Sequence, residues 1–244
     1  MPLRLIVAPV LTSRHGFTTR RGGVSTGPYR SLNLSLKVGD DPARVAENRR
    51  RVLAHFGHPP LAELDQEHGA EVAVVGGPGR YRGDALVTDT PGLLLGVSAA
   101  DCYPLLLEDP ASKAVAAAHA GWRGVAAGVV ENVVAALARL GGGAPEGFVA
   151  ALGPGICGRC YQVGPEVVAA VGAENGRPDP AAPGRFRLDL RAAIAARLRG
   201  LGLNRIWVSD RCTYEDPELF SYRRQGPRSG RMWGLIQRRD DGTL

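Results

Sequence analysis

Histidine and lysine are scarce in this sequence, and long hydrophobic runs are missing from it. The 244 residues include five histidines and only two lysines, so arginine supplies almost all of the basic charge. Copper oxidases that hold several ions need many histidines in paired His-x-His motifs, which are absent here, so that class is disfavoured. No apolar run approaches the roughly 18 residues of a membrane span, and the N-terminal apolar stretch is too short for a signal peptide. We therefore expect a cytoplasmic protein without a membrane partner.

The overall composition is that of an ordinary globular chain. Hydrophobic residues make up 44% and charged residues 22% of it, a balance that supports a substantial apolar core. The net charge is +6, but the arginines are scattered and form no basic tract interleaved with aromatic residues, which argues against a nucleic-acid partner. Four cysteines in a chain expected to be intracellular predict reduced thiols or metal ligands instead of disulfides.

Strand and helix patterns are distributed along the whole chain. Short apolar runs predict strands at residues 3–9, 71–75, 84–88, 93–98, 113–119, 148–152, 205–209 and 232–236. Helices are predicted between Asp41 and Gly57, between Gly124 and Gly141, from Pro165 onward, and after the N-cap Asp189. Residues 15–41 and 173–184 are expected to be loops. Because no repeat or long linker divides the chain, residues 1–244 are predicted to form one layered domain of strands and helices.

The stretch from Gly96 to Gly124 is predicted to carry the chemical centre. Its strand–turn–strand pattern places Cys102 at a turn and His119 where the second strand enters a glycine-rich corner. His68 lies in a separate glycine-marked turn before a valine-rich run. One cysteine and two histidines are the ligand set of an open zinc site, in which a fourth position is left for water or substrate. Such a zinc ion lowers the pKa of water toward neutrality and so supports hydrolysis or deamination.

The residues alone leave other roles open for this trio. Cys102 is a candidate nucleophile with His68 or His119 as its base, as in metal-free cysteine hydrolases. A buried inert thiol and two packing histidines are a further alternative. The H-x-E and P-C-x-x-C signature of nucleobase deaminases, the P-loop and the dinucleotide fingerprint are all absent. The pattern therefore predicts a zinc or thiol hydrolase or transferase and leaves its substrate undefined.

Two further groups of residues are candidates for binding. Arg20 and Arg21 stand beside two glycines, a combination that suits an anion, although a solvated hairpin tip is the simpler interpretation. Cys157 and Cys160 form a C-x-x-C motif, with Cys212 as the other remaining thiol. A structural zinc needs four ligands, and the motif does not open a helix as thioredoxin-like motifs do. Packing or a substrate-lining loop is therefore favoured here, and a redox or metal role stays open.

Together, the motifs resemble those of the laccase-domain family, formerly called polyphenol oxidases and now understood as multifunctional purine nucleoside phosphorylases. The segments that carry the resemblance are, in order, TTRRGGVSTGPYRSLNLSLKVGDDPARVAENR, QEHGAEV, GDALVTDTPGLLLGVSAADCYPLLL, AAAHAGWRG, ALGPGICGRCYQVGPEV and GRMWGLI. Their agreement in order is more specific than any single motif. The resemblance implies an α+β fold, a single layered domain with a mixed β-sandwich core flanked by helices.

The resemblance also implies a reaction. Family members split adenosine, inosine and methylthioadenosine with phosphate and also deaminate adenosine, so purine nucleosides and phosphate are the expected partners. The family's His, Cys and His zinc ligands fall on His68, Cys102 and His119. One zinc ion per chain is then expected, with copper as an alternative metal, in a monomer or a homodimer.

Residues near these motifs are assigned roles by hypothesis. We expect Asp101 to take part in catalysis by orienting a ligand or moving a proton, and Asn33 to contact the sugar or the base. Arg20, Arg21 or Arg159 is expected to hold the phosphate through charge-assisted hydrogen bonds.

Overall fold

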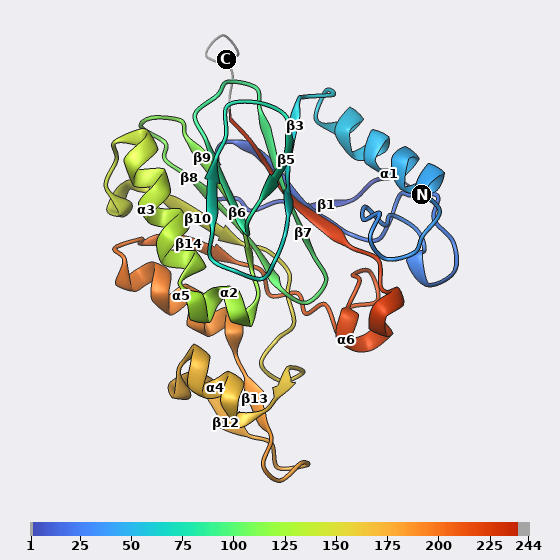
Figure 1. The fold of residues 1–244 in the computed structure, drawn as a ribbon, viewed down its shortest axis with the longest axis vertical. Helices are drawn as coiled ribbons and strands as arrows, with labels where there is room; N and C mark the ends of the chain where they lie inside the picture. Colours follow the sequence, from blue (N-terminus) through green and yellow to red (C-terminus); the bar gives the residue numbers. More distant parts are fainter. Residues whose placement is uncertain (1, 239–244) are drawn as a thin grey trace.

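Two six-stranded β-sheets packed face to face form the centre of the computed structural model, which describes residues 2–238 (Figure 1). The first sheet has the order β1 (Leu5–Ile6), β2 (Arg14–Thr18), β15 (Met232–Gln237), β7 (Leu94–Ala99), β3 (Leu61–Asp65) and β5 (Gly79–Arg82). The second has the order β14 (Arg205–Val208), β10 (Val149–Leu152), β8 (Tyr103–Glu108), β9 (Val115–Ala120), β6 (Ala85–Thr88) and β4 (Val72–Val74). Both sheets mix parallel and antiparallel pairs, which confirms the predicted mixed β-sandwich.

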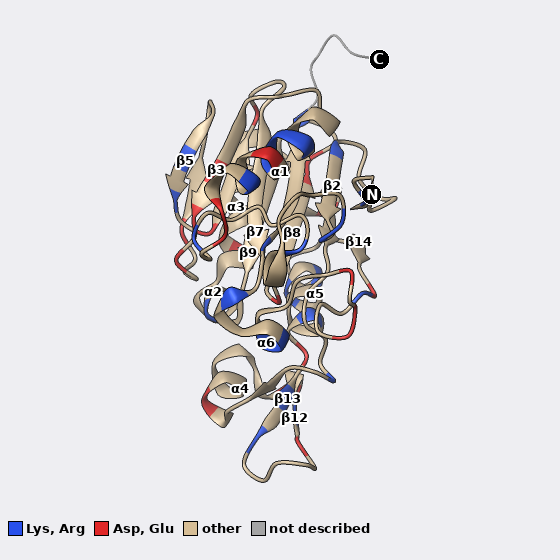
Figure 2. Ribbon diagram, turned by 90° about the vertical axis from the view of Figure 1, so that its right-hand side faces the viewer, with Lys and Arg blue, Asp and Glu red and all other residues tan. Residues whose placement is uncertain are grey.

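Helices cover the outer faces of both sheets. On the first sheet lies α1 (Pro42–His55), and on the second lie α2 (Trp122–Ala127), α3 (Val129–Gly141) and α5 (Leu190–Gly200) (Figure 1). A smaller sheet of β11 (Gln162–Val163), β13 (Phe186–Leu188) and β12 (Gly176–Pro178) lies with α4 (Pro165–Val171) at one end of the molecule (Figure 2). The remaining helical segments are α6 (Tyr222–Gln225), η1 (Gly27–Tyr29), η2 (Pro145–Gly147), η3 (Ala173–Asn175) and η4 (Gly226–Arg228). Within residues 2–238, none of the helices combines the length and the apolar character that crossing a bilayer requires.

Strands β8 and β9 are central because both of their faces are covered. Every residue of YPLLLE and VAAAHA is buried. Successive side chains of a strand point to opposite faces, so Leu106 and Ala117 pack between the two sheets while Leu105 and Ala118 pack under the helices. This double burial explains continuous apolar runs in place of an alternating pattern. It also gives the ends of β8 and β9 a rigid support.

Several local predictions agree with the structure. Asp41 caps α1 by accepting from the backbone N–H of Ala43, and Pro42 occupies the first turn. Asp189 caps α5 by accepting from the N–H of Ala192. Side-chain oxygens of aspartate satisfy backbone donors that a helix start leaves unpaired, which is why these boundaries are visible in the sequence.

The helix predicted between Gly124 and Gly141 is wrong in its continuity. Gly128 has φ +95° and ends α2, and α3 begins directly after it. Glycine adopts this left-handed conformation without the steric cost that a Cβ brings, so the apolar stripe continues while the helix axis is broken. The break allows α2 to start at Trp122 and α3 to cover β6 and β9.

Other elements were not expected from the sequence. Residues 14–18 form β2 where a loop was predicted, and residues 173–184 contain η3 and β12. Strands β3 and β8 had no predicted counterpart, and β8 places the runs 93–98 and 113–119 in different sheets. Cys102 therefore lies in the crossover from one sheet to the other, directly before β8.

Candidate metal centre

His68, Cys102 and His119 converge although 51 residues separate the first from the last. Their donor atoms all lie within 4.8 Å of one another. Antiparallel pairing of Tyr103 with Ala120 sets the end of β9 beside Cys102. His68 comes from the turn that follows β3, and its ring stands at 89° to that of His119 with 4.8 Å between the ring centres. The trio chosen from the sequence is thus one cluster in space.

Asp84 holds the two histidines of this centre and was not identified from the sequence. Its buried carboxylate accepts from Nδ1 of His119 at 2.8 Å. It also accepts from the backbone N–H groups of Glu67, His68 and Gly69 at 2.7–3.1 Å. His68 has φ +62°, an unfavourable backbone conformation for a non-glycine residue, and these three hydrogen bonds fix it. A carboxylate that orients a metal-binding imidazole is a common outer-shell partner in zinc sites.

The charges of the centre are strongly coupled. Burial alone raises the pKa of the Cys102 thiol, but the adjacent His119 and His68 more than offset this and bring the pKa to about 6. Burial lowers the pKa of His119, whereas Cys102 and Asp84 raise it to about 9. For Asp84, the effect of burial is outweighed by its bonds to His119 and the backbone, and the pKa lies below its usual range. The metal-free centre is therefore a thiolate–imidazolium pair near neutral pH.

A single zinc-type ion fits this donor set. Two imidazoles and one thiolate leave a fourth coordination position open, as in catalytic zinc sites. Gly121 keeps the space in front of the donors clear, since a Cβ there would lie 3.0 Å from Sγ of Cys102 and 3.2 Å from Cδ2 of His68. A cluster of several copper ions does not fit, because Nε2 and Nδ1 of His15 are engaged by Ala8 and Ser13, and His55 and His58 lie at the far end of α1.

The trio opens into a pocket of about 600 Å³. Its walls combine aromatic rings and cations, which come from the 34–38 segment, α1, β5, α2, Tyr161, α6 and the start of β15. The aromatic residues are Trp122, Tyr161, Tyr222 and Trp233, and the cationic residues are Lys37, Arg49, Arg80, Arg123, Arg223 and Arg231. The arginine-bearing helices α2 and α6 both lie at the ends of β7–β9 (Figure 2). A pocket with these walls suits a ligand that has both a flat ring system and an anion.

Three of the cations carry unbalanced charge. Lys37 pairs with Asp65, and Arg49 and Arg80 pair with Glu63. By contrast, no carboxylate among residues 2–238 forms an ion pair with Arg123, Arg223 or Arg231.

Each of these three guanidinium groups lies over an aromatic ring of the same pocket. Arg123 covers Trp122 with 4.6 Å between the guanidinium carbon and the ring centre. Arg223 covers Tyr161 at 5.3 Å, and Arg231 covers Tyr222 at 5.7 Å. Nη1 of Arg223 also donates to the carbonyl of Gln162, and Nη1 of Arg231 to those of Ser229 and Gly230. Ring stacking and these bonds hold the guanidinium groups, whose remaining N–H donors face no carboxylate partner and suit an anion. The grouping could not be read from the sequence, because Arg123 lies 100 residues before Arg223 and only folding brings it to Arg223 and Arg231.

Asp101 lies next to the centre with both carboxylate oxygens occupied. Oδ1 accepts from the hydroxyl of Thr213 and Oδ2 from the backbone N–H of Arg223, each at 2.6 Å. Its φ of +96° is maintained by these bonds. Asp101 thus ties the Cys102 turn to the C-terminal segment that carries Arg223.

Asn33 is fully buried and does not line the pocket. Its amide group bonds with Ser35, with the carboxylate of Asp40 and with the N–H of Arg231. The predicted contact between Asn33 and a sugar or base is therefore replaced by a positioning role: Asn33 fixes the backbone of Arg231, which does line the pocket.

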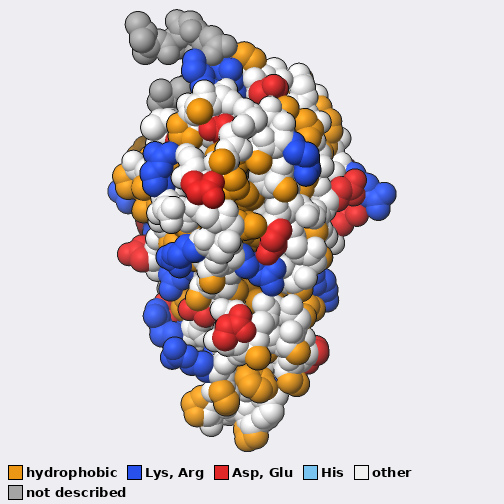
Figure 3. Space-filling model, turned by 90° about the vertical axis from the view of Figure 1, so that its left-hand side faces the viewer, with side chains coloured by type: hydrophobic (Ala, Val, Ile, Leu, Met, Phe, Trp, Pro, Cys, Tyr) orange, Lys and Arg blue, Asp and Glu red, His pale blue; other side chains and the backbone are white. Residues whose placement is uncertain are grey.

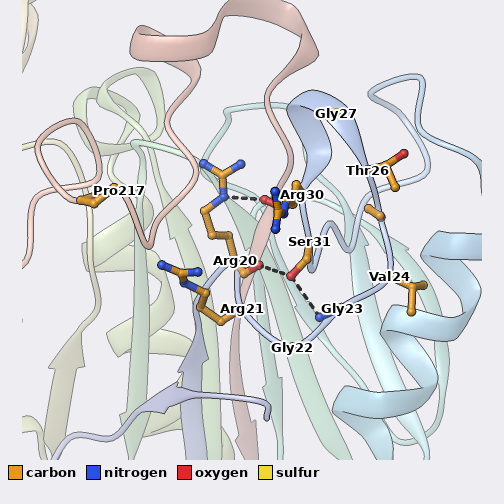
Figure 4. A pocket seen from close by; sticks show the side chains of 11 residues that line it. Arg20, Arg21, Gly22, Gly23, Val24, Thr26, Gly27, Arg30, Ser31 and Pro217 are labelled. Carbon is orange, nitrogen blue, oxygen red and sulfur yellow. Dashed lines mark hydrogen bonds between the residues drawn. The ribbon is translucent and has the colours of Figure 1, made fainter. Parts of the chain in front are cut away.

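Arg20 and Arg21 line a different pocket. It has a volume of about 710 Å³ and shares no lining residue with the pocket of the trio (Figure 4). Nε of Arg20 donates to the carbonyl of Arg30 at 2.5 Å, and Nε of Arg21 lies 3.3 Å from Glu218. The structure therefore does not bring these two arginines to the candidate metal centre.

Arg159 is also outside the trio's pocket. Its exposed guanidinium pairs with Glu215 at 2.9 Å. Of the sequence-predicted substrate contacts, none lines the pocket that contains His68, Cys102 and His119. The signal that was overlooked is the arginine directly after the centre's own motif, Arg123 in HAGWRG.

This α+β sandwich with an open three-donor centre belongs to a defined family. The family described as multi-copper polyphenol oxidoreductase laccase matches residues 14–239, and the chain is a member of it. Among curated proteins, the purine nucleoside phosphorylase of Deinococcus radiodurans is 47% identical, over 96% of this chain and 92% of that protein. The purine nucleoside phosphorylase YfiH of Escherichia coli is 40% identical, over 90% and 91% of the two chains.

Solved structures show the same fold. YlmD from Geobacillus stearothermophilus superposes with a TM-score of 0.89 at 36% identity, over 96% of this chain and 94% of that one. Protein NMB0706 of Neisseria meningitidis superposes with a TM-score of 0.87 at 37% identity, over 98% of this chain and all of that one. The family resemblance and the fold predicted from the motifs are thereby confirmed.

Proposed function

We propose that this chain is a purine nucleoside phosphorylase that binds one zinc ion at His68, Cys102 and His119 and also deaminates adenosine. The observation that carries the proposal is the position of this trio in a pocket walled by aromatic rings and three unbalanced arginines. A nucleoside phosphorylase binds a purine ring, a ribose and a phosphate ion at one site, and this pocket combines the aromatic and cationic side chains that suit them. The names of the relatives in Deinococcus radiodurans and Escherichia coli support the same activity.

The arginines and aromatic side chains divide the work of binding. Trp122, Tyr161 and Tyr222 offer ring faces to the purine. Arg123, Arg223 and Arg231 hold phosphate through charge-assisted hydrogen bonds and take over the role predicted for Arg20, Arg21 and Arg159. Phosphorolysis breaks the bond between the base and the anomeric carbon, and a phosphate oxygen forms the new bond to that carbon while the base takes up a proton. Fixing phosphate and nucleoside side by side lowers the entropic part of this barrier.

The residues around the trio keep the donors in place. When bound, zinc supplies a Lewis acid that polarises substrate oxygen and lowers the pKa of water, as deamination requires. Asp84 keeps the Nδ1 proton of His119 on the side away from Cys102 and thus fixes which ring nitrogen faces the ion. Asp101 positions Arg223 by accepting from its backbone N–H.

A metal-free cysteine hydrolase is the second candidate. The observation that favours it is the thiolate–imidazolium pair of Cys102 and His119, the arrangement that activates a cysteine nucleophile. Asp84 would then serve as the group that orients the base. Exhaustive chelation separates the two mechanisms, because it abolishes the activity of a zinc enzyme and leaves that of a thiol hydrolase intact.

The deciding experiment uses purified protein of known metal content with adenosine, with and without inorganic phosphate. We expect adenine and ribose 1-phosphate to form only when phosphate is present. We also expect each active chain to hold one zinc ion at the trio. Inosine formed in both conditions supports the deaminase activity. If zinc-loaded protein catalyses neither the phosphorolysis nor the deamination of adenosine, the proposal is wrong. Metal analysis of the same sample decides between zinc and copper.

The phosphate site is tested by paired substitutions. Arg123→Gln is expected to raise the KM for phosphate about tenfold or more, the value of one charge-assisted hydrogen bond, with a smaller effect on the KM for adenosine. Arg20→Gln removes the same charge from the other pocket and is expected to leave both constants unchanged. A phosphate KM that responds to Arg20→Gln and not to Arg123→Gln would restore the original assignment.

A further inference from the structure

A second cluster of metal-ligand side chains lies outside the pocket. The donor atoms of Cys157, Cys160, Cys212 and Glu215 all lie within 4.8 Å of one another. Cys157 and Cys212 are buried, Cys160 is partly buried and Glu215 is exposed. None of these four residues lines the pocket of the trio, so this cluster is not part of the proposed reaction site.

The sheet topology explains why such distant thiols meet. Strands β10 and β14 run parallel, with Leu152 opposite Val208 at their carboxyl ends. Both chains continue side by side beyond the sheet, where Gly155 pairs with Cys212 and the N–H of Thr213 donates to the carbonyl of Gly155. Cys157 and Cys160 follow on the first segment and Glu215 on the second, so two ligands come from each side.

Backbone geometry around the thiols resembles that of a metal-binding knuckle. The C-x-x-C segment closes a tight turn, in which the N–H groups of Cys160 and Tyr161 donate to the carbonyl of Cys157 at 2.9 and 3.0 Å. The N–H of Cys157 points at Sγ of Cys212 at 3.3 Å, and the N–H of Arg159 at Sγ of Cys157. Amide donors aimed at sulfur favour the thiolate, the form that binds metals. Without an ion, burial outweighs them and raises the pKa of the Cys157 thiol, so the case for a site rests on the arrangement of the donors.

Glu215 completes a four-donor set. Its Oε1 lies 3.3 Å from Sγ of Cys160, while its Oε2 pairs with Arg159 at 2.9 Å. Oε1 also accepts from Nε of Arg159 at 3.4 Å, so the guanidinium holds both carboxylate oxygens while one of them faces the sulfur. This cation offsets part of the negative charge of three thiolates and a carboxylate. Zinc–sulfur bonds of about 2.3 Å place the sulfurs of a tetrahedral site roughly 3.8 Å apart. Because the donor atoms here lie within 4.8 Å of one another, the sulfurs would have to approach by about 1 Å at most.

We propose that Cys157, Cys160, Cys212 and Glu215 bind a second, structural zinc ion. Four protein donors leave no position for substrate, as in closed structural sites. Ion binding releases the thiol protons to solvent and joins two segments that have little regular secondary structure. These segments carry Tyr161 on one side and Tyr222 and Arg223 on the other, all of which line the pocket. The ion therefore acts as a clasp that holds one wall of the pocket together.

Zinc stoichiometry of four proteins tests this proposal without using activity. Wild-type protein prepared with zinc is expected to retain two ions per chain, Cys102→Ser one, Cys160→Ser one, and the double variant none. With Co²⁺ in place of zinc, Cys102→Ser should keep the near-ultraviolet absorption of a three-thiolate site. That absorption should be roughly threefold stronger than in Cys160→Ser. In Cys160→Ser the thiol cluster is expected to bind no ion, and the ion at the trio has Cys102 as its single sulfur ligand.

Glu215→Gln in the Cys102→Ser background tests the carboxylate. It is expected to lose the remaining zinc on dialysis against a chelator much faster than the matched control Glu166→Gln, which changes an exposed glutamate on α4. Absence of zinc and of Co²⁺–thiolate absorption in Cys102→Ser would overturn the proposal. So would an intact mass lacking two hydrogens in freshly prepared protein, because it would show a disulfide in place of the metal. Since Cys102→Ser leaves the second cluster unaltered, the test does not depend on the folding of Cys160→Ser.

Discussion

The two clusters of potential metal ligands, the trio and the thiol cluster of Cys157, Cys160, Cys212 and Glu215, differ in their surroundings. At the trio, three donors supported by β9 and by the Asp84 carboxylate face a pocket of about 600 Å³. At the thiol cluster, four donors from two irregular segments lie together and do not line this pocket. In the two proposed sites, the open centre rests on strands and hydrogen bonds that need no metal, whereas in the closed one the ion would supply the rigidity that its irregular segments lack. The number of donors and the stiffness of their supports therefore indicate whether a metal site serves chemistry or structure.

The two clusters are also physically connected. Thr213 follows Cys212 directly, and its buried hydroxyl donates to Asp101, the neighbour of Cys102. Arg224 strengthens the same segment by donating to the carbonyls of Thr213, Tyr214 and Asp216. A disturbance of the thiol cluster is expected to reach the open centre through this segment, which includes Thr213.

The largest effect is expected from Cys102→Ala, which removes the open centre and leaves the closed one. Zinc binding by the trio, phosphorolysis and deamination should all be abolished, because two imidazoles alone do not hold the ion. The measurements are zinc per chain and product formation from adenosine. A variant that stays active and keeps the full zinc content would exclude Cys102 as a ligand.

Asp84→Asn should weaken the open centre without removing a ligand. The amide cannot match the carboxylate's bonds to His119 and to three backbone N–H groups, so zinc affinity is expected to fall by about 10- to 100-fold. Competition with a chromophoric chelator measures this affinity. Asp84 directly precedes β6, and the exposed Asp89 directly follows it, so Asp89→Asn is the matched control. Equal affinities in the two variants would contradict the orienting role of Asp84.

Gly121→Ala should crowd the open centre by a single methyl group. The backbone at this position, φ −84° and ψ 165°, accepts alanine, so the effect is confined to the contacts at 3.0 Å with Cys102 and 3.2 Å with His68. We expect kcat to fall about tenfold, because small displacements of reacting groups are costly, with a minor change in stability. In Gly147→Ala the new methyl group meets no atom within 4 Å, so its kcat should equal that of the wild type.

The smallest effect concerns the connection between the clusters. Thr213→Val keeps the side-chain shape but leaves Asp101 without the hydroxyl donor, which should lower the free energy of unfolding by about 1–3 kcal/mol. The KM for phosphate should rise a few-fold, because Asp101, whose Oδ2 accepts from the N–H of Arg223, is held less firmly, while zinc content stays unchanged. Chemical denaturation and steady-state kinetics measure the two quantities, with Thr90→Val as control. An unaltered KM would show that the clusters act independently.

Local signals made much of the fold predictable. Helices α1 and α5 follow from the caps Asp41 and Asp189 and from apolar spacing, and β10 and β15 from short buried runs. Strand β8 was missed because its six residues follow a turn and contain Pro104, which usually argues against a central strand. Pro104 lies opposite His119 in the β8–β9 pair. The hydrogen bonds of the other residues in this pair compensate for the N–H donor that proline lacks. Pairing in three dimensions outweighed the local preference.

The sequence predicted that His68, Cys102 and His119 come together, and it did not predict their surroundings. Cysteine and histidine in glycine-marked turns are rare enough in this chain to stand out, which is how His68, Cys102 and His119 were found. Asp84 is one of 24 acidic residues and carries no local mark of its role. Arg20 and Arg21 looked suitable for phosphate from their neighbours alone, yet folding placed them at another pocket (Figure 4).

The sequence shows which side chains are charged, but it does not show which of them form pairs. The face that carries α3 and α5 shows basic and acidic side chains interspersed (Figure 3), as the scattered arginines in the sequence suggest. The three unbalanced arginines are distinguished instead by what they lack, a carboxylate partner. A sequence lists charges, but only their mutual distances decide which of them neutralise one another.

By itself, the sequence determined the class of fold, the principal helices and the three residues that form the open cluster, because caps, apolar periodicity and rare residue types act locally. Only the tertiary structure decided which arginines face the pocket, that Asp84 orients His119, and that Cys157, Cys160 and Cys212 meet Glu215. Each of these depends on strands far apart in the chain lying side by side, as β10 and β14 do. Hydrogen bonds and ligand geometry act over about 3 Å, and a distance of that size between remote residues is set by packing and not by local sequence.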